Sequence, residues 1–212
     1  MFYRVRKPSK IESDKKYPAL FVFHGMGSNE QDMLSLVDEL EDRFFIFSVR
    51  GHVSQPPGYA YFTIQGFGKP HREGFDHGIN QLSSFIGYIE EQYQVDSERL
   101  YLLGFSQGAI VSMTLGLTLG NKVKGIIALN GYIPSFVKED YNIKPVEEVS
   151  LFISHGEFDN ILPYQWGIEN NEYFTSLNAQ VTFKTYQVGH TVSLENKRDF
   201  TSWLIEELNK DQ

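Results

Sequence analysis

The segment Gly104–Gly108, which reads Gly-Phe-Ser-Gln-Gly, is the most informative motif in the sequence. It follows the apolar run Leu100–Leu103 and precedes a helical stretch, so Ser106 would lie at a tight turn between a strand and a helix. Glycines two residues before and after the serine let the chain turn without a clash. The N–H groups and positive dipole end of the helix would face the hydroxyl. The motif therefore predicts a serine nucleophile, and the alternative is a plain glycine-rich turn.

A serine hydroxyl needs an adjacent base that is held by a carboxylate. With a nucleophile at such a turn, the acid and then the histidine follow the serine along the chain. Asp159 is the expected acid because it lies in a loop just beyond the apolar run Val149–Ser154, and Glu157 is an alternative two residues earlier. The remaining aspartates after Ser106 lie in a charged stretch or on or after the final helix: Asp140, Asp199 and Asp211.

Two histidines follow Ser106 in the sequence. His155 precedes Asp159, which is the wrong order, and we expect it to be a structural histidine at a strand end. His190 follows the predicted strand Val181–Tyr186 and precedes the final helix. A base on a loop is expected at that place, so His190 is the predicted base.

A tetrahedral intermediate needs two preorganised N–H donors. One should be the amide of Gln107, directly after the nucleophile. The other should come from the loop after the predicted strand Ala19–Phe23, which reads His24-Gly25-Met26-Gly27. We expect Met26 to supply its N–H there and His24 to orient the loop rather than to act in catalysis.

Short apolar or β-branched runs alternate with longer helical stretches along the chain. The predicted strands are an edge strand at Phe2–Val5 and then Ala19–Phe23, Phe44–Val49, Leu100–Leu103, Gly125–Leu129, Ser150–Ser154 and Val181–Tyr186. The predicted helices are one capped by Ser28 with Met33, Leu34, Val37 and Leu40 as its apolar stripe, then Phe75–Tyr93, Ser106–Gly120, Pro163–Leu177, and one capped by Ser193 with Phe200, Trp203 and Leu204 inward. This order predicts a single α/β domain over residues 1–212, with a mostly parallel sheet, helices on both faces and no large cap domain.

The segment from Gly51 to Gly74 is longer than an inert loop usually is. It would lie over the carboxyl ends of the strands, beside the nucleophile. We therefore expect its aromatic residues to line a substrate pocket, and the alternative is that they anchor the segment to the core. The predicted substrate-binding residues are Tyr59, Tyr61, Phe62 and Phe67.

Composition excludes several other functions. The 212 residues contain no cysteine, which excludes a thiolate nucleophile, a disulfide framework and cysteine-ligated metal sites. A net charge of −8 disfavours binding to nucleic acid or to anionic lipid. The N-terminus carries no secretory signal, and no membrane span is expected. His71, Asp76 and His77 match no strong ligand motif, so no metal is predicted.

In the motifs around the predicted nucleophile, acid, base and oxyanion loop, the chain resembles the phospholipase/carboxylesterase family. This is a group of small, lidless α/β-hydrolases that includes acyl-protein thioesterases. The resemblance spans nearly the whole chain and implies Ser106, Asp159 and His190 as a triad, with the amides of Met26 and Gln107 as oxyanion donors. One segment departs from the thioesterase branch, where a Trp-Phe-Asp-like motif is usual: here Pro56–Phe62 reads Pro-Pro-Gly-Tyr-Ala-Tyr-Phe. The matching motifs are His24–Gly27, Ser48–Gly51, Gly104–Gly108, His155–Asp159 and Gly189-His190.

The sequence thus predicts a cytoplasmic serine carboxylesterase that acts on a small ester with a short to medium acyl group and needs no cofactor. A thioesterase or lysophospholipase with the same triad is the nearest alternative. A non-catalytic ligand-binding module on the same fold is a further one. The sequence leaves open whether the protein forms a homodimer.

Overall fold

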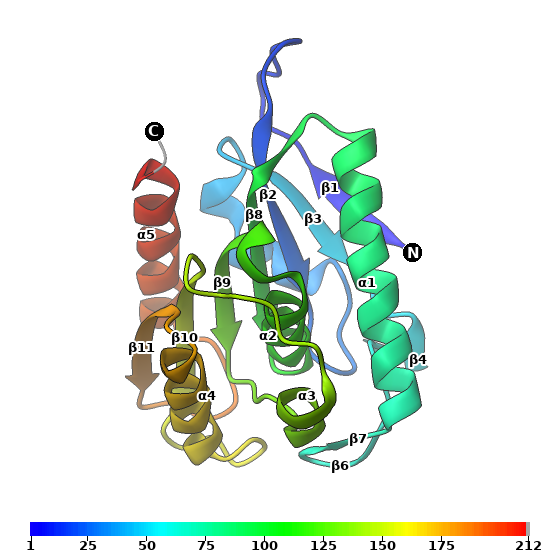
Figure 1. Ribbon diagram of the computed structural model, residues 1–212, viewed down its shortest axis with the longest axis vertical. Helices are drawn as coiled ribbons and strands as arrows, with labels where there is room; N and C mark the ends of the chain where they lie inside the picture. The colour runs from blue at the N-terminus through cyan, green and yellow to red at the C-terminus, as the bar shows by residue number, and fades with distance from the viewer. Residues whose placement is uncertain (211–212) are drawn as a thin grey trace.

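The computed structural model describes residues 1–210, and its centre is a seven-stranded sheet in the order β1-β3-β2-β8-β9-β10-β11 (Figure 1). All neighbouring strands are parallel except the edge pair β1 and β3, which confirms the mostly parallel sheet and the edge strand predicted near the N-terminus. The strands are β1 (Tyr3–Arg6), β2 (Tyr17–Phe23), β3 (Phe45–Val49), β8 (Val95–Phe105), β9 (Val123–Leu129), β10 (Ser150–Gly156) and β11 (Gln180–Tyr186).

Apolar side chains on both faces of the sheet form two cores. Successive residues of a strand point to opposite faces, so Phe21 and Phe23 of β2 join the core under α1 and α2, while Leu20 and Val22 join the core under α5. Figure 1 shows α1 to α4 on the near side of the sheet. The α-helices are α1 (Arg72–Gln92), α2 (Gln107–Leu119), α3 (Ser135–Asp140), α4 (Tyr164–Ser176) and α5 (Leu194–Lys210).

The helix predicted after Ser28 is wrong in type. The chain forms two short 3₁₀ helices there, Asp32–Leu36 and Asp38–Leu40. Of the predicted apolar stripe, Leu34 is only half-buried, while Met33, Val37 and Leu40 are buried. The Ser28 hydroxyl donates to the Asp32 carboxylate at 2.6 Å instead of capping a helix. Polar side chains that bond locally favour turns over a continuous α-helix. At the other end of the chain, Ser193 does cap α5, since its hydroxyl accepts from the Asn196 amide at 3.1 Å.

Residues 51–71 contain two small hairpins, residues 72–74 begin α1, and α3 is a further element that the sequence did not reveal. The hairpins pair β4 (Val53–Gln55) with β5 (Gly58–Ala60) and β6 (Ile64–Gly66) with β7 (Lys69–Pro70). Tyr59 of β5 exchanges backbone hydrogen bonds of 2.8 Å with Gly27 and Ser28, which ties the first hairpin to the loop after β2. No helix among residues 1–210 is long and apolar enough to cross a membrane.

Candidate active site

Ser106, His190 and Asp159 form one chain of hydrogen bonds at the carboxyl ends of the strands. The Ser106 hydroxyl lies 2.8 Å from Nε2 of His190, and Nδ1 of His190 lies 2.7 Å from Oδ2 of Asp159. With the proton on Nδ1, Nε2 is free to accept the serine proton. This is the geometry in which a histidine can activate a serine and a carboxylate can hold the histidine.

The turn that carries Ser106 is strained and tightly packed. Ser106 has φ 55°, which places a non-glycine residue outside the regions that L-residues prefer. A Cβ on Gly104 would lie 2.1 Å from the carbonyl carbon of Gly108, and a Cβ on Gly108 would lie 2.0 Å from the Phe23 carbonyl oxygen. Only glycine fits at either place, so the two glycines allow β2, β8 and α2 to meet beneath the serine.

The side chain of Asp159 has no solvent exposure, and several donors compensate its charge. Oδ1 accepts from the amides of Ile161 and Leu162, both at 2.9 Å, and Oδ2 accepts from Nδ2 of Asn130 at 2.9 Å as well as from His190. Burial acts to raise the pKa of Asp159, but these hydrogen bonds outweigh it and hold the pKa below the usual value. The carboxylate therefore stays ionised beside the imidazole.

The rival candidates lie elsewhere or have other partners. His155 is buried and donates from Nε2 to the Leu162 carbonyl at 2.9 Å, with Oδ2 of Asp159 at 3.4 Å. Burial lowers its pKa, which keeps it neutral, as a structural histidine at the end of β10 should be. Glu157 accepts from the Thr185 hydroxyl. Asp140 bonds Arg72, Asp199 bonds Lys184 and Tyr186, and Asp211 lies outside the described residues.

Met26 and Gln107 both line the cavity that contains Ser106, as the expected oxyanion donors should. Gln107 is the first residue of α2, so its N–H has no acceptor within the helix. The peptide between Gly25 and Met26 is held through its carbonyl, which accepts from Nδ1 of His24 at 2.7 Å and from the Ser28 amide at 3.2 Å. These bonds orient the peptide whose N–H belongs to Met26.

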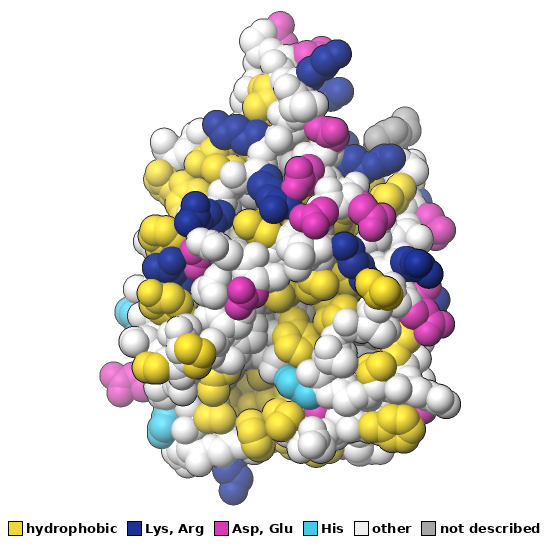
Figure 2. All heavy atoms as spheres, turned by 180° about the vertical axis from the view of Figure 1, so that it is seen from behind, with side chains coloured by type: hydrophobic (Ala, Val, Ile, Leu, Met, Phe, Trp, Pro, Cys, Tyr) yellow, Lys and Arg dark blue, Asp and Glu magenta, His cyan; other side chains and the backbone are white. Residues whose placement is uncertain are grey.

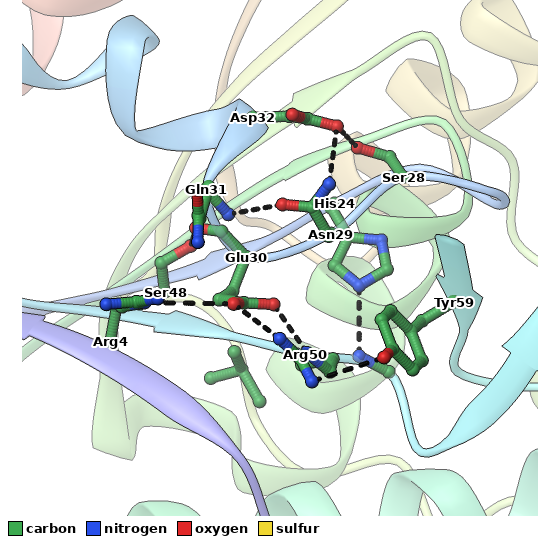
Figure 3. A network of polar contacts seen from close by, with 12 residues as sticks. Arg4, His24, Ser28, Asn29, Glu30, Gln31, Asp32, Ser48, Arg50 and Tyr59 are labelled. Carbon is green, nitrogen blue, oxygen red and sulfur yellow. Dashed lines mark hydrogen bonds and ion pairs between the residues drawn. The ribbon is translucent and has the colours of Figure 1, made fainter. Parts of the chain in front are cut away.

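A partly buried ion pair between Glu30 and Arg50 also holds this loop (Figure 3). Both oxygens of Glu30 accept from Arg50, at 2.7 and 2.8 Å, and the Arg50 guanidinium lies over the rings of Phe2 and Tyr59. Arg50 holds the pKa of the Glu30 carboxyl below its usual value. The pair connects the end of β3, which carries Arg50, to the loop after β2.

The cavity beside Ser106 has a volume of about 310 Å³ and is mostly apolar. Figure 2 shows a hollow of this kind on one face, lined by hydrophobic side chains with a histidine at its edge. Its lining residues are Met26, Phe62, Ile64, Phe67, Gly68, Ser106, Gln107, Ile110, Tyr132, Ile161, Leu162 and His190.

Two of the four residues predicted to bind substrate line this cavity, and two do not. Phe62 and Phe67 come from the segment around the second hairpin and form part of the wall. Tyr61 is buried behind it, where its hydroxyl donates to the Val49 carbonyl at 2.6 Å and accepts from the His24 amide. Tyr59 lines a different surface hollow, next to Arg50. For Tyr59 and Tyr61 the anchoring alternative holds.

The side chain of Gln107 has a second contact that sequence reasoning missed. It is buried, accepts from the Tyr61 amide at 2.7 Å and donates to the Phe62 carbonyl at 2.9 Å. This pair of bonds holds the hairpin segment against α2. The Gly-x-Ser-x-Gly motif assigns a role only to the backbone N–H of the residue after the serine, so it gives no signal for these side-chain hydrogen bonds.

His71, Asp76 and His77 belong to no metal cluster. Within residues 1–210 no group of three or more potential ligands comes together. Asp76 instead bonds Arg72 and Tyr141, and His77 stacks edge-on against His52 with ring centres 5.6 Å apart.

A serine at a strained strand-to-helix turn, with an acid and then a histidine after it, defines an α/β-hydrolase of the serine hydrolase class. Residues 9–205 match the family described as Phospholipase/Carboxylesterase, and the chain belongs to that family of carboxylic ester hydrolases.

Relatives and solved structures agree with this assignment. Acyl-protein thioesterase 1 of Debaryomyces hansenii is 31% identical over 160 residues, which are 71% of this chain and 68% of that protein. Acyl-protein thioesterase 1 homolog 1 of Dictyostelium discoideum is 26% identical and covers 99% of this chain and 100% of its own. The fold is similar to that of the Bacillus cereus carboxylesterase, with a TM-score of 0.86 at 23% identity over 97% of this chain and 93% of that one.

Proposed function

We propose that the protein hydrolyses esters or thioesters of short to medium acyl groups through an acyl-enzyme on Ser106. The observation that carries the proposal is the hydrogen-bonded chain from Ser106 through His190 to the ionised Asp159, which opens into an apolar cavity. The reaction needs no cofactor, because the nucleophile, the base and the oxyanion donors all belong to the protein.

In the first half-reaction, Ser106 Oγ attacks the carbonyl carbon while Nε2 of His190 takes the hydroxyl proton. The negative oxygen of the tetrahedral intermediate accepts from the amides of Met26 and Gln107. His190 then returns the proton to the leaving alcohol or thiol. In the second half-reaction, a water gives its proton to His190 and attacks the acyl-enzyme, and the acid leaves as Ser106 is reprotonated.

The size and polarity of the cavity support the substrate class. A volume of about 310 Å³ equals that of roughly ten water molecules at ~30 Å³ each. An acyl chain of about eight to ten carbons would fill such a space, and the apolar lining would bind it by removing it from water.

The oxygen-ester and thioester alternatives differ only in the leaving group. The similarity to proteins named acyl-protein thioesterase favours a thioester, and the departure at Pro56–Phe62 favours an ordinary ester. Paired substrates with the same acyl chain on p-nitrophenol, on a thiol and on lysophosphatidylcholine would separate these outcomes. Varying the chain from two to about twelve carbons would locate the acyl length that the cavity accepts.

The test of the mechanism is labelling of the purified protein by a fluorophosphonate. The native protein should be labelled and should release a burst of p-nitrophenol, and Ser106→Ala should do neither. Ser112→Ala is the matched control, because Ser112 is buried on α2 and its hydroxyl has no partner among the described residues. If the native protein is neither labelled nor active on any ester, the protein is a ligand-binding module and the proposal is wrong.

We also propose a cytoplasmic location, as the sequence predicts, since a chain without cysteine has no disulfide that would need an oxidising compartment. Cell fractionation checks the compartment, and light scattering checks for a homodimer.

A further inference from the structure

The end of β9 lies between the strand that presents the nucleophile and the strand that precedes the acid. In the sheet, β9 pairs with β8 on one side and with β10 on the other. Ser106 follows β8, and Asp159 lies three residues beyond β10. No member of the proposed triad comes from β9, yet its last residues touch both sides of the site.

Three hydrogen bonds of 2.9 Å make this connection. The Ser106 amide donates to the Leu129 carbonyl, and the Asn130 amide donates to the Ser154 carbonyl of β10. The Asn130 side chain then reaches Asp159, where Nδ2 donates to Oδ2. Residues 129 and 130 thus link the backbone of the nucleophile to the carboxylate of the acid.

We propose that Asn130 is a positioning residue for catalysis: it holds Asp159 Oδ2, the same oxygen that accepts the proton of His190 Nδ1, in line with the imidazole. The inference rests on the proposed function of Ser106, Asp159 and His190. The groups that face Asp159 Oδ2 are Asn130, His190 and, at 3.4 Å, Nε2 of His155. Asn130 is the one of these three that carries no titratable group, so the donor itself does not change its protonation with pH.

The conformation and burial of Asn130 argue against a role in stability alone. It is fully buried with φ 52°, a left-handed conformation that asparagine tolerates better than most residues do. Its Oδ1 has no hydrogen-bond partner among the described residues. An unpaired buried oxygen is destabilising. The one side-chain hydrogen bond that the carboxamide makes to the described residues is therefore the donation to Asp159.

Asn130→Gly tests the proposal, because glycine adopts the left-handed conformation without strain and removes only the side chain. Loss of a hydrogen bond to a charged group should lower kcat by about tenfold or more. Asp159 with one donor fewer would hold the imidazolium more strongly. The acid limb of the pH dependence of kcat/KM should therefore move to higher pH by roughly half a unit or more.

Asn196→Ala is the matched control. Asn196 lies on α5, is also buried, donates from Nδ2 to the Ser154 hydroxyl at 3.0 Å, and likewise has an unpaired Oδ1. It does not touch Asp159. This variant should change the melting temperature without moving the acid limb, so a shift confined to Asn130→Gly supports the proposal.

Asn130→Asp keeps the size of the side chain and provides a second test of the proposal if the glycine variant does not fold. The new carboxyl can donate to Asp159 only while it is protonated. Once ionised, it adds a second negative charge beside Asp159 and His190, so the acid limb should again move to higher pH and the ratio of variant to native kcat/KM should vary between about pH 5 and about pH 8.

An acid limb that stays in place in Asn130→Gly, or a ratio for Asn130→Asp that does not vary with pH, would overturn the inference. A native protein that reacts with no fluorophosphonate would instead overturn the proposed function itself, so the two failures are distinguishable.

Discussion

The Gly51 amide donates to Nε2 of His24 at 2.9 Å, and this single contact determines that the proton of the buried imidazole lies on Nδ1. Nδ1 can then donate to the Gly25 carbonyl at 2.7 Å, which belongs to the peptide that carries the Met26 N–H. Burial lowers the pKa of His24, so the ring stays neutral and keeps this arrangement. The end of β3 thereby orients one of the two proposed oxyanion donors through a histidine.

His24→Ala should therefore lower kcat with little change in KM, because the misplaced N–H is needed in the transition state more than in substrate binding. We expect a loss of about tenfold or more, short of the 10²–10³ that follows removal of a whole donor. Steady-state kinetics and the affinity for a boronic acid that mimics the tetrahedral intermediate measure this. Tyr61→Phe is the control, since the Tyr61 hydroxyl bonds the His24 amide but not the Gly25 carbonyl. Equal losses of kcat in both variants would contradict the prediction.

Glu30→Gln should destabilise the protein by about 1–3 kcal/mol at neutral pH, since it removes one charge of a pair whose carboxylate has no solvent exposure. The pKa of Glu30 is depressed in the folded state, so its contribution is present above the unfolded pKa of about 4.3 and is lost as the pH falls below that value. Denaturant unfolding at a series of pH values should show the difference between native and variant shrinking in acid. A difference that is constant or grows in acid would contradict this assignment.

Gly108→Ala should abolish labelling of Ser106 or prevent folding, because its Cβ would lie 2.0 Å from the backbone oxygen of Phe23. The atoms that this Cβ would meet belong to the backbone of Phe23 and His24 and cannot rotate away. The loss in free energy of unfolding should therefore exceed about 3 kcal/mol. Gly87→Ala on α1 is the comparison, since a Cβ there meets nothing within 4 Å and should stabilise the helix by up to ~1 kcal/mol. Thermal unfolding and fluorophosphonate labelling of the two variants check both statements.

Phe67→Ala should raise KM for medium-chain esters by roughly three- to tenfold, because Phe67 lines the cavity and would contact the acyl chain. KM for acetyl esters should not change, since an acetyl group is too short to reach this wall. The Phe67 side chain is 59% exposed in the free protein. Its exposure also means that the melting temperature should hardly change. Tyr59→Ala, from the neighbouring hairpin, should not alter the dependence on chain length, since Tyr59 lies outside the cavity. A chain-length effect of the same size in both variants would show that this wall does not bind the acyl group.

The elements that position Ser106, Asp159 and His190 were predictable because each depends on short-range signals. Ser106 lies between Gly104 and Gly108, and this spacing is typical of a tight turn from a strand into a helix. Asp159 and His190 each follow a run of strand-forming residues. The helix expected after Ser28, which carries no member of the triad, was predicted wrongly. Its apolar spacing was read correctly, but local side-chain bonds made by Ser28 and Asn29 favour turns there.

Residues that act through contacts distant in sequence were not predictable. Tyr61 lies in the segment predicted to line the pocket, but its hydroxyl bonds the Val49 carbonyl and the His24 amide instead. Asn130 carries no motif of its own, and its contact with Asp159 spans 29 positions along the chain. Such pairs depend on strand order, which no local pattern specifies.

The sequence by itself predicted the proposed nucleophile and the acid and histidine that could follow it, and its lack of cysteine excludes a thiolate nucleophile. Those conclusions depend on residue type and chain order, and both are read directly from the chain. Only the tertiary structure decided which aromatic side chains face the cavity and which anchor the core. It also decided that β9, lying between β8 and β10, connects Ser106 to Asp159 through Leu129 and Asn130. The physical reason is that hydrogen bonding and burial act between neighbours in space, and packing of the sheet brings together residues that the chain keeps far apart.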